Sequence, residues 1–228
     1  MSSIYSTGEY FSKNPGWHQD HSQWKSSLVK KILKNNCILP SRIVEVGCGA
    51  GGILEDLYLT VQPQPICLGY DVSPQAYSLA AKRQVTGLEF RLGSPPLDTS
   101  SFDVVLAMDV LEHVEDYLGF IRMLKSLGSW KIFHIPLDLS MISMYRPSYL
   151  QQAREGVGHI HYFTRETALA SLEQAGLVVK DWFYTSAHLE LGGNGQKRLQ
   201  ILRKFLFFRY PDLCSRLLGD LSILVLAE

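Results

Sequence analysis

The sequence lacks the features that mark several large protein classes. Its four cysteines contain no Cys-x-x-Cys pair, which argues against a zinc site and a disulfide scaffold. Acidic and basic residues are equal in number, at 22 each, so no excess charge favours nucleic acid. No apolar run could cross a bilayer, and the first residues lack the basic and apolar regions of a signal peptide. We therefore expect a cytoplasmic protein with no integral membrane segment, no nucleic-acid partner and no metal.

What the sequence does have is a glycine-rich stretch, RIVEVGCGAGG, over residues 42–52. Branched apolar residues precede Gly47, Gly49, Gly51 and Gly52, and a helix-like run follows. A strand, a glycine turn and a helix start together bring backbone N–H groups close to a ligand. The first, second and fourth of these glycines also fit the dinucleotide spacing G-x-G-x-x-G, so spacing alone leaves a nicotinamide cofactor as an alternative.

Glu45 places a carboxylate inside the end of this strand. Burying an unpaired acid is costly, so we expect Glu45 to have a partner. Either it accepts hydrogen bonds from nearby loop amides or it faces a ligand. The pattern Val-Glu-Val-Gly-Cys-Gly-Ala-Gly resembles motif I of the class I S-adenosylmethionine-dependent methyltransferases. The resemblance implies that Glu45 faces the methionine end of the cofactor and that the glycines pass beneath it.

A second acid follows the next apolar run, ICLGYDV, at Asp71. It lies about twenty residues beyond the glycine loop, where both cofactor families place a carboxylate against ribose hydroxyls. The alternative is that Asp71 only caps the following Ser-Pro turn. After the next expected strand, 88–92, methyltransferases of this type carry Gly-Asp; here Ser94 follows the glycine, and Ser94 or Asp98 takes over the adenine contact.

The segment FDVVLAMDVLEHV, residues 102–114, carries the second part of the resemblance. It is similar to the motif after the fourth strand in small-molecule methyltransferases of the ubiquinone-biosynthesis-like group, and a nicotinamide enzyme has no reason to repeat it. We expect a strand that leads into Asp109, then a loop through Glu112 and His113 to a helix at 115–127. Glu112 and His113 either line the cofactor pocket or only stabilise the helix start.

Together the two motifs imply S-adenosylmethionine as the cofactor. The resemblance places Glu45, Gly47, Cys48, Gly49, Gly51, Asp71, Val72, Ser94, Met108, Asp109 and His113 around it. We interpret Cys48 as a small packing residue and not as a nucleophile. The implied fold is a Rossmann-like, doubly wound α/β sheet of seven strands, mostly parallel with the last strand antiparallel, and with helices on both faces.

The implied reaction is in-line transfer of a methyl group to a small-molecule or glycan-type acceptor, at oxygen. An oxygen acceptor needs a base within hydrogen-bond reach, and neutral imidazole is competent near pH 7. His134, His159 and His161 are the candidates, and each could equally be structural. Two other functions remain open: a nicotinamide-dependent oxidoreductase, and a catalytically silent subunit that binds the cofactor.

We expect a single domain over residues 1–228. Residues 1–40 hold an aromatic segment and a first helix from Ser22, and the aromatic segment is either a lid or a cap on the core. Residues 41–185 form the cofactor-binding core and 221–228 the final strand. The helical insertion 186–220 contains a basic, aromatic helix from 197 that packs on the domain, forms a homodimer or contacts a membrane surface.

Overall fold

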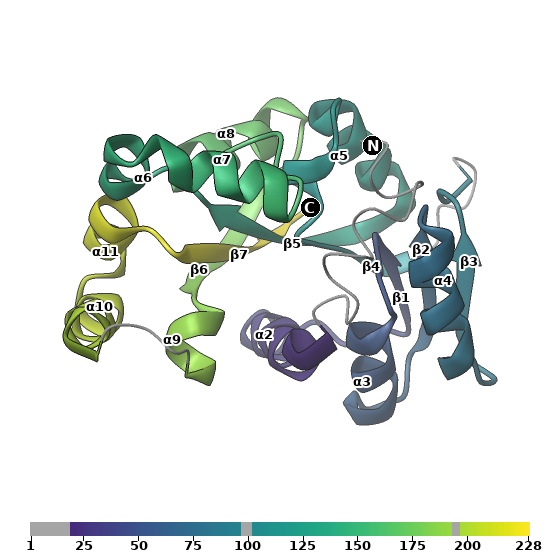
Figure 1. Cartoon of the computed structure of the whole chain (residues 1–228). Coiled ribbons are helices and arrows are strands. Elements are labelled where there is room, and N and C mark those ends of the chain that lie inside the picture. The colour runs from purple at the N-terminus through teal and green to yellow at the C-terminus, as the bar shows by residue number, and fades with distance from the viewer. Residues whose placement is uncertain (1–18, 97–101, 193–196) are drawn as a thin grey trace.

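The computed structural model describes residues 19–96, 102–192 and 197–228 (Figure 1). The predicted aromatic lid and Asp98 therefore lie outside the described residues, apart from the last residues before the first helix. That helix, α2 (Ser22–Asn35), has Ser22 as its first residue, and its N-cap is His21, which makes no side-chain cap hydrogen bond.

A mixed sheet forms the centre of the described chain. Its strands are β1 (Arg42–Val46), β2 (Ile66–Asp71), β3 (Leu88–Leu92), β4 (Phe102–Met108), β5 (Gly128–Leu137), β6 (Val179–Thr185) and β7 (Leu221–Ala227). They are arranged in the order β3-β2-β1-β4-β5-β7-β6. Strand β7 pairs antiparallel with both β5 and β6, whereas β1 to β5 pair in parallel. The predicted fold class is confirmed.

Helices cover both faces of the sheet (Figure 1). On one face lie α2, α3 (Gly52–Thr60) and α4 (Pro74–Ala80); on the other lie α5 (Tyr117–Leu127) and α8 (Arg165–Gln174). Each layer buries apolar side chains against alternate residues of the strands. The first core contains Leu28, Ile32, Leu54, Leu57 and Val104, and the second contains Ile121, Leu124, Phe133 and Leu172.

Strand alternation also decides where the acid of β1 points. Ile43 packs in the core beneath α2 and α3, whereas Val44 and Val46 pack on the opposite face. Because successive side chains of a strand alternate, Glu45 shares a face with Ile43 and is directed toward α2. Glu45 is buried, with an exposed fraction of 1%.

Two helices fill the region between residues 137 and 158, where the sequence shows no periodic pattern. They are α6 (Met141–Tyr145) and α7 (Pro147–Gly156). A capping box made by Ser140 and Ser143 starts α6. A second capping box, made by Thr164 and Thr167, starts α8.

The predicted insertion holds α9 (Ala187–Leu191), α10 (Lys197–Arg209) and α11 (Pro211–Leu218). Phe207 is buried in a small core with Leu189 and Cys214, while Ile201, Phe205 and Phe208 are exposed. The homodimer through this insertion stays a prediction. In the described part of the chain, no helix combines the length and apolar character that crossing a membrane requires.

Short turns complete the chain. They are the 3-10 turns η2 (Gln19–His21), η3 (Ala81–Arg83) and η4 (Leu111–His113). His21 of η2 and both Glu112 and His113 of η4 line the cavity described next.

Candidate functional site

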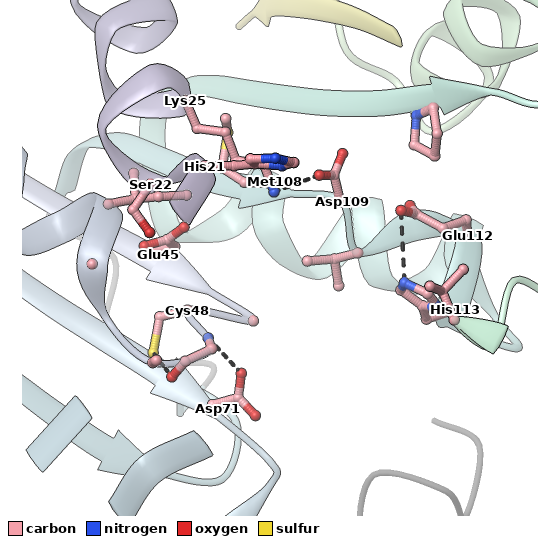
Figure 2. A pocket seen from close by; sticks show the side chains of 18 of the residues that line it. His21, Ser22, Lys25, Glu45, Cys48, Asp71, Met108, Asp109, Glu112 and His113 are labelled. Carbon is pink, nitrogen blue, oxygen red and sulfur yellow. Dashed lines mark hydrogen bonds and ion pairs between the residues drawn. The ribbon is translucent and has the colours of Figure 1, made fainter. Parts of the chain in front are cut away.

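A cavity of about 490 Å³ opens beyond the carboxyl ends of β1, β2 and β4. Ligands of open α/β sheets bind at this edge. Among the predicted cofactor residues, those that line the cavity are Glu45, Gly47, Cys48, Gly49, Asp71, Val72, Met108, Asp109 and His113 (Figure 2). Ser94 and Gly51 are not among the lining residues; Ser94 is exposed after β3, so no described contact supports its adenine role.

The glycine loop between β1 and α3 needs glycine for two reasons. Gly47, Gly49 and Gly51 have φ values of +81°, +54° and +79°, which other residues rarely adopt. There is also no room for side chains: a Cβ on Gly47 would lie 2.6 Å from Val110 Cγ2, and one on Gly51 would lie 2.6 Å from the Phe90 ring. Gly51 therefore shapes the turn, while Gly47 and Gly49 face the cavity.

Asp71 joins this loop to the end of β2. Its Oδ2 accepts a hydrogen bond from Gly49 N at 2.8 Å, and its Oδ1 accepts one from Ser73 N at 2.8 Å. The cap on the Ser-Pro turn is thus present, and Asp71 also lines the cavity. Burial raises the pKa of Asp71, and hydrogen bonds from Ser73, Gly49 and Val72 oppose the rise. A carboxylate offers about four acceptor positions, so capacity remains for ligand hydroxyls.

Glu45 is the acid with the stronger need for a partner. Its Oε2 has no hydrogen-bond partner among the described residues, so loop amides do not satisfy that oxygen. Burial raises the pKa of Glu45 to about 8; Lys25 opposes this rise and Asp71 adds to it. A positively charged ligand group beside Glu45 would favour the ionised form.

Asp109, at the end of β4, lies between the ammonium group of Lys25 and the imidazole of His134. Lys25 Nζ lies 2.5 Å from Asp109 Oδ2, and His134 Nδ1 hydrogen-bonds Asp109 Oδ1. Asp109 has a φ of +59°, a conformation that Asp tolerates better than most residues. Burial would raise the pKa of Asp109, but the charges and hydrogen bonds of His134 and Lys25 outweigh burial and hold the pKa well below its ordinary value.

The three candidate bases occupy different places. His134 is buried on β5, and its Nε2 lies 2.9 Å from Thr185 Oγ1, so both ring nitrogens have protein partners. His161 hydrogen-bonds the carbonyl of Val114 at 2.9 Å and lies against Tyr117. Of the three, His159 is the one that lines the cavity.

His159 is brought to the cavity by the segment before α8. The carbonyl oxygen of Glu112 accepts hydrogen bonds from Ile160 N at 2.8 Å and His161 N at 3.1 Å. His159 and His113 lie edge to face, with ring centroids 5.0 Å apart. Burial, and next the neighbouring His159, lower the pKa of His113 to about 4. Burial, and next the charge of Asp109, raise the pKa of Glu112 well above its ordinary value.

Comparison with known proteins identifies the family to which the chain belongs. A family model described as a methyltransferase domain matches residues 17–181. The chain belongs to the S-adenosylmethionine-dependent methyltransferase family.

Two curated relatives match parts of this methyltransferase. Ubiquinone biosynthesis O-methyltransferase of Haemophilus ducreyi is 31% identical over 105 residues, which are 41% of this chain and 43% of that protein. Ajmaline N-methyltransferase of Rauvolfia serpentina is 29% identical over 138 residues, which are 51% of this chain and 47% of that protein. The matched parts span less than half the length of both relatives.

A solved structure shares the fold over nearly the whole length. Magnesium protoporphyrin IX methyltransferase from Synechocystis PCC 6803, with bound SAH, has a TM-score of 0.59 and 15% identity. The match covers 99% of this chain and 96% of that chain. At this identity the likeness shows the fold alone.

The charged side chains that line the cavity of the methyltransferase are complementary to the cofactor of its family. Five carboxyl groups line it, from Glu45, Asp71, Asp109, Glu112 and Asp220, and among the described lining residues Lys25 is the one lysine or arginine that opposes them. S-adenosylmethionine carries positive charge at its sulfonium and amino groups, which such a surface stabilises. Glu45, with an unpartnered oxygen, and Asp71, with acceptor capacity left, are the residues suited to hold it.

Some residues of the methyltransferase site were not predicted. Lys25 is one of several lysines on α2, and nothing in the sequence distinguishes it from the others. Its role follows from the packing of α2 over β1 and β4, which places the lysine between Glu45 and Asp109 (Figure 2). Asp138, which hydrogen-bonds His159 Nδ1 at 2.7 Å, was also missed because it follows a strand without any recognisable motif.

Proposed function

We propose that this methyltransferase transfers a methyl group to an oxygen atom of a small hydroxylated molecule, of glycan or phenolic type. The observation that carries the proposal is the acidic cavity, with the glycine loop at one end and His159 at the other. The volume of about 490 Å³ lies within the range of small-molecule sites. The names of the ubiquinone relatives support oxygen as the acceptor atom.

S-adenosylmethionine, when bound, supplies a methyl group that is already activated by its sulfonium. What remains for the protein is alignment and proton removal. Asp71 is suited to accept hydrogen bonds from ribose hydroxyls, and Glu45 to face the cationic methionine end. Holding acceptor and methyl carbon in line can contribute roughly 7–11 kcal/mol to lowering the barrier. His159 lies where it could help to deprotonate an acceptor, because it lines the same cavity.

Nitrogen is the second candidate acceptor atom, since one relative bears the name of an N-methyltransferase. The nicotinamide alternative is set aside by the family match and by the sheet, in which antiparallel β7 lies between β5 and β6 instead of the parallel order of dinucleotide-binding domains. The silent cofactor-binding subunit remains the competing function.

Two measurements test the proposal. Calorimetric titrations with S-adenosylmethionine, its demethylated product and NAD should show binding of the first two and none of NAD. A screen with radiolabelled methyl donor against glycan and phenolic extracts should then give a labelled product. Tight cofactor binding without any labelled product, in a screen that includes amines, would favour the silent subunit.

A further inference from the structure

A cluster of three side chains at the far end of the cavity has the geometry of a metal site. Glu112 Oε1 lies 3.7 Å from His113 Nε2 and 4.0 Å from His159 Nε2. One possible ligand atom from each residue lies within 4.8 Å of the others. Figure 2 shows Glu112 and His113 facing each other, across the cavity from Cys48 and Asp71.

These separations are too long for hydrogen bonds but suit ligands of a shared ion. Bonds from a transition metal to imidazole nitrogen and carboxylate oxygen are about 2.0–2.2 Å long, so two ligands of one ion lie about 3–4 Å apart. Small side-chain movements would bring all three atoms into the first coordination sphere.

The outer contacts direct both imidazoles. His113 Nδ1 lies 3.1 Å from the carbonyl oxygen of Gly158, and His159 Nδ1 lies 2.7 Å from Asp138 Oδ2. Both partners are acceptors, so each Nδ1 carries the proton of a neutral ring, and the lone pair of each ring is on Nε2. Such bonds at the distal nitrogen are the ones that orient metal-binding histidines.

The carboxylate of Glu112 is the second, independent observation. It is fully buried, and neither of its oxygens has a hydrogen-bond partner among the described residues. Two nitrogen lone pairs and a carboxylate oxygen therefore face one another, an arrangement that a cation between them would stabilise. The nearby Lys25 does not serve, because its ammonium is bound to Asp109 at 2.5 Å.

We propose that Glu112, His113 and His159 bind a divalent first-row transition-metal ion. Two imidazoles and one carboxylate suit zinc, iron or manganese better than calcium or magnesium, which favour oxygen ligands. Three protein ligands would leave coordination positions for a molecule bound in the cavity, which all three residues line. The sequence predicted no metal site, because Glu112 and His113 are far from His159 along the chain and become neighbours only in the folded protein.

The role of the ion deepens the proposed function and rests on it. A divalent ion that contacts an acceptor hydroxyl lowers its pKa, so the proton can leave to solvent near neutral pH. The acceptor oxygen then forms a bond to the methyl carbon while the carbon–sulfur bond of the sulfonium breaks and leaves a thioether. In this scheme His159 is a ligand of the ion, and the ion replaces His159 as the group that promotes deprotonation of the acceptor.

Metal binding can be tested without turnover. The full chain, freed of metal by a chelator and dialysed, is titrated calorimetrically with zinc chloride and with manganese chloride in the absence of cofactor. We expect one ion per chain for at least one metal, together with a rise in melting temperature and, for manganese, a changed electron paramagnetic resonance spectrum.

Variants locate the site. Glu112→Gln and His159→Ala should abolish stoichiometric binding, and Asp138→Asn should weaken it about 10- to 100-fold by removing an outer contact. His161→Ala is the matched control, from the same segment but outside the cluster, and should bind metal as the wild type does. Circular dichroism checks that each variant folds; if His159→Ala does not, Asp138→Asn and Glu112→Gln still decide.

The results separate the metal site from the proposed function. No ion bound to wild type, or equal binding by wild type, Glu112→Gln and Asp138→Asn, would overturn the metal site and leave cofactor binding untouched. If the wild type binds the metal ion but does not bind S-adenosylmethionine, the proposed function and the role of the ion are both overturned. Chelator-sensitive methyl transfer, restored by added metal, would support both.

Discussion

Two carboxyl groups at opposite ends of the cavity, those of Asp71 and Glu112, differ in whether the protein satisfies their hydrogen bonds. At the glycine-loop end, both oxygens of Asp71 accept backbone hydrogen bonds, from Gly49 and Ser73. At the histidine end, the Glu112 carboxylate accepts none from the described residues and faces two imidazoles. The first end is made by neighbours along two short motifs, whereas the second is assembled from η4 and the segment before α8. The Asp71 carboxylate is therefore hydrogen-bonded without a ligand, whereas the Glu112 carboxylate is the group that the proposed cation would stabilise.

The largest effect on cofactor binding is expected from a substitution in the glycine loop. Valine at position 49 would be strained at the φ of +54°, so Gly49→Val should show no measurable S-adenosylmethionine binding by calorimetry. Gly156→Val is the control, since Gly156 has open space around it and an ordinary φ. Normal cofactor binding by Gly49→Val would mean that the cofactor does not lie against this loop.

Removing the carboxylate of Asp71 should give the next largest effect. Asp71→Ala removes an acceptor for charge-assisted hydrogen bonds, so cofactor binding should weaken by about 2–4 kcal/mol, or about 30- to 700-fold in Kd. Asp103→Ala is a matched control, because Asp103 Oδ2 also accepts two backbone hydrogen bonds, from Ser41 and Arg42, outside the cavity. If both variants lose affinity equally, the loss comes from backbone support and not from contact with the cofactor.

A smaller effect, graded with pH, is expected at Glu45. Its pKa of about 8 in the folded protein means that it holds a proton at pH 6. Binding of a cationic ligand favours the ionised form, so cofactor affinity should rise from pH 6 to pH 8, by up to about tenfold per pH unit. Calorimetry across this range should show a flat profile for Glu45→Gln and an unchanged slope for Glu89→Gln, an exposed acid on β3. A flat profile in the wild type would contradict the prediction.

The smallest effect on cofactor binding is expected at His161. Unlike His159, it does not line the cavity. His161 bonds the Val114 carbonyl outside the cavity, so His161→Ala should lower the free energy of unfolding by about 1 kcal/mol. Its cofactor affinity should equal that of the wild type. Chemical denaturation and calorimetry measure the two quantities, and weakened cofactor binding would show that this anchor also shapes the cavity.

How much the sequence could predict follows the same division. Gly47, Gly49 and Asp71 were predictable because each lies at a fixed place in a local motif at the end of a strand. Glu112 lies within the second motif, but the sequence does not reveal that His159 is its neighbour, because their proximity depends on the backbone hydrogen bonds from Ile160 and His161 to the Glu112 carbonyl. Lys25 could not be chosen among the lysines of α2 without knowing which face of that helix meets β1.

The fold was predictable for a related reason. Buried strands such as β4 and β7 are apolar runs with clear limits, and their order follows from the resemblance. The helices α6 and α7 were missed because they are short and because α7 is largely exposed, so no apolar periodicity marks it.

The position of β7 has a consequence for how this protein folds during its synthesis on the ribosome. Residues 221–227 form the strand that joins β5 to β6, although they are synthesised after both. Until β7 emerges, β5 exposes an edge and β6 has no partner in the described sheet, so two strands with unpaired backbone groups await the same late segment. Strand β7 thus joins β5 to β6, and this side of the sheet is completed only once synthesis has passed residue 227.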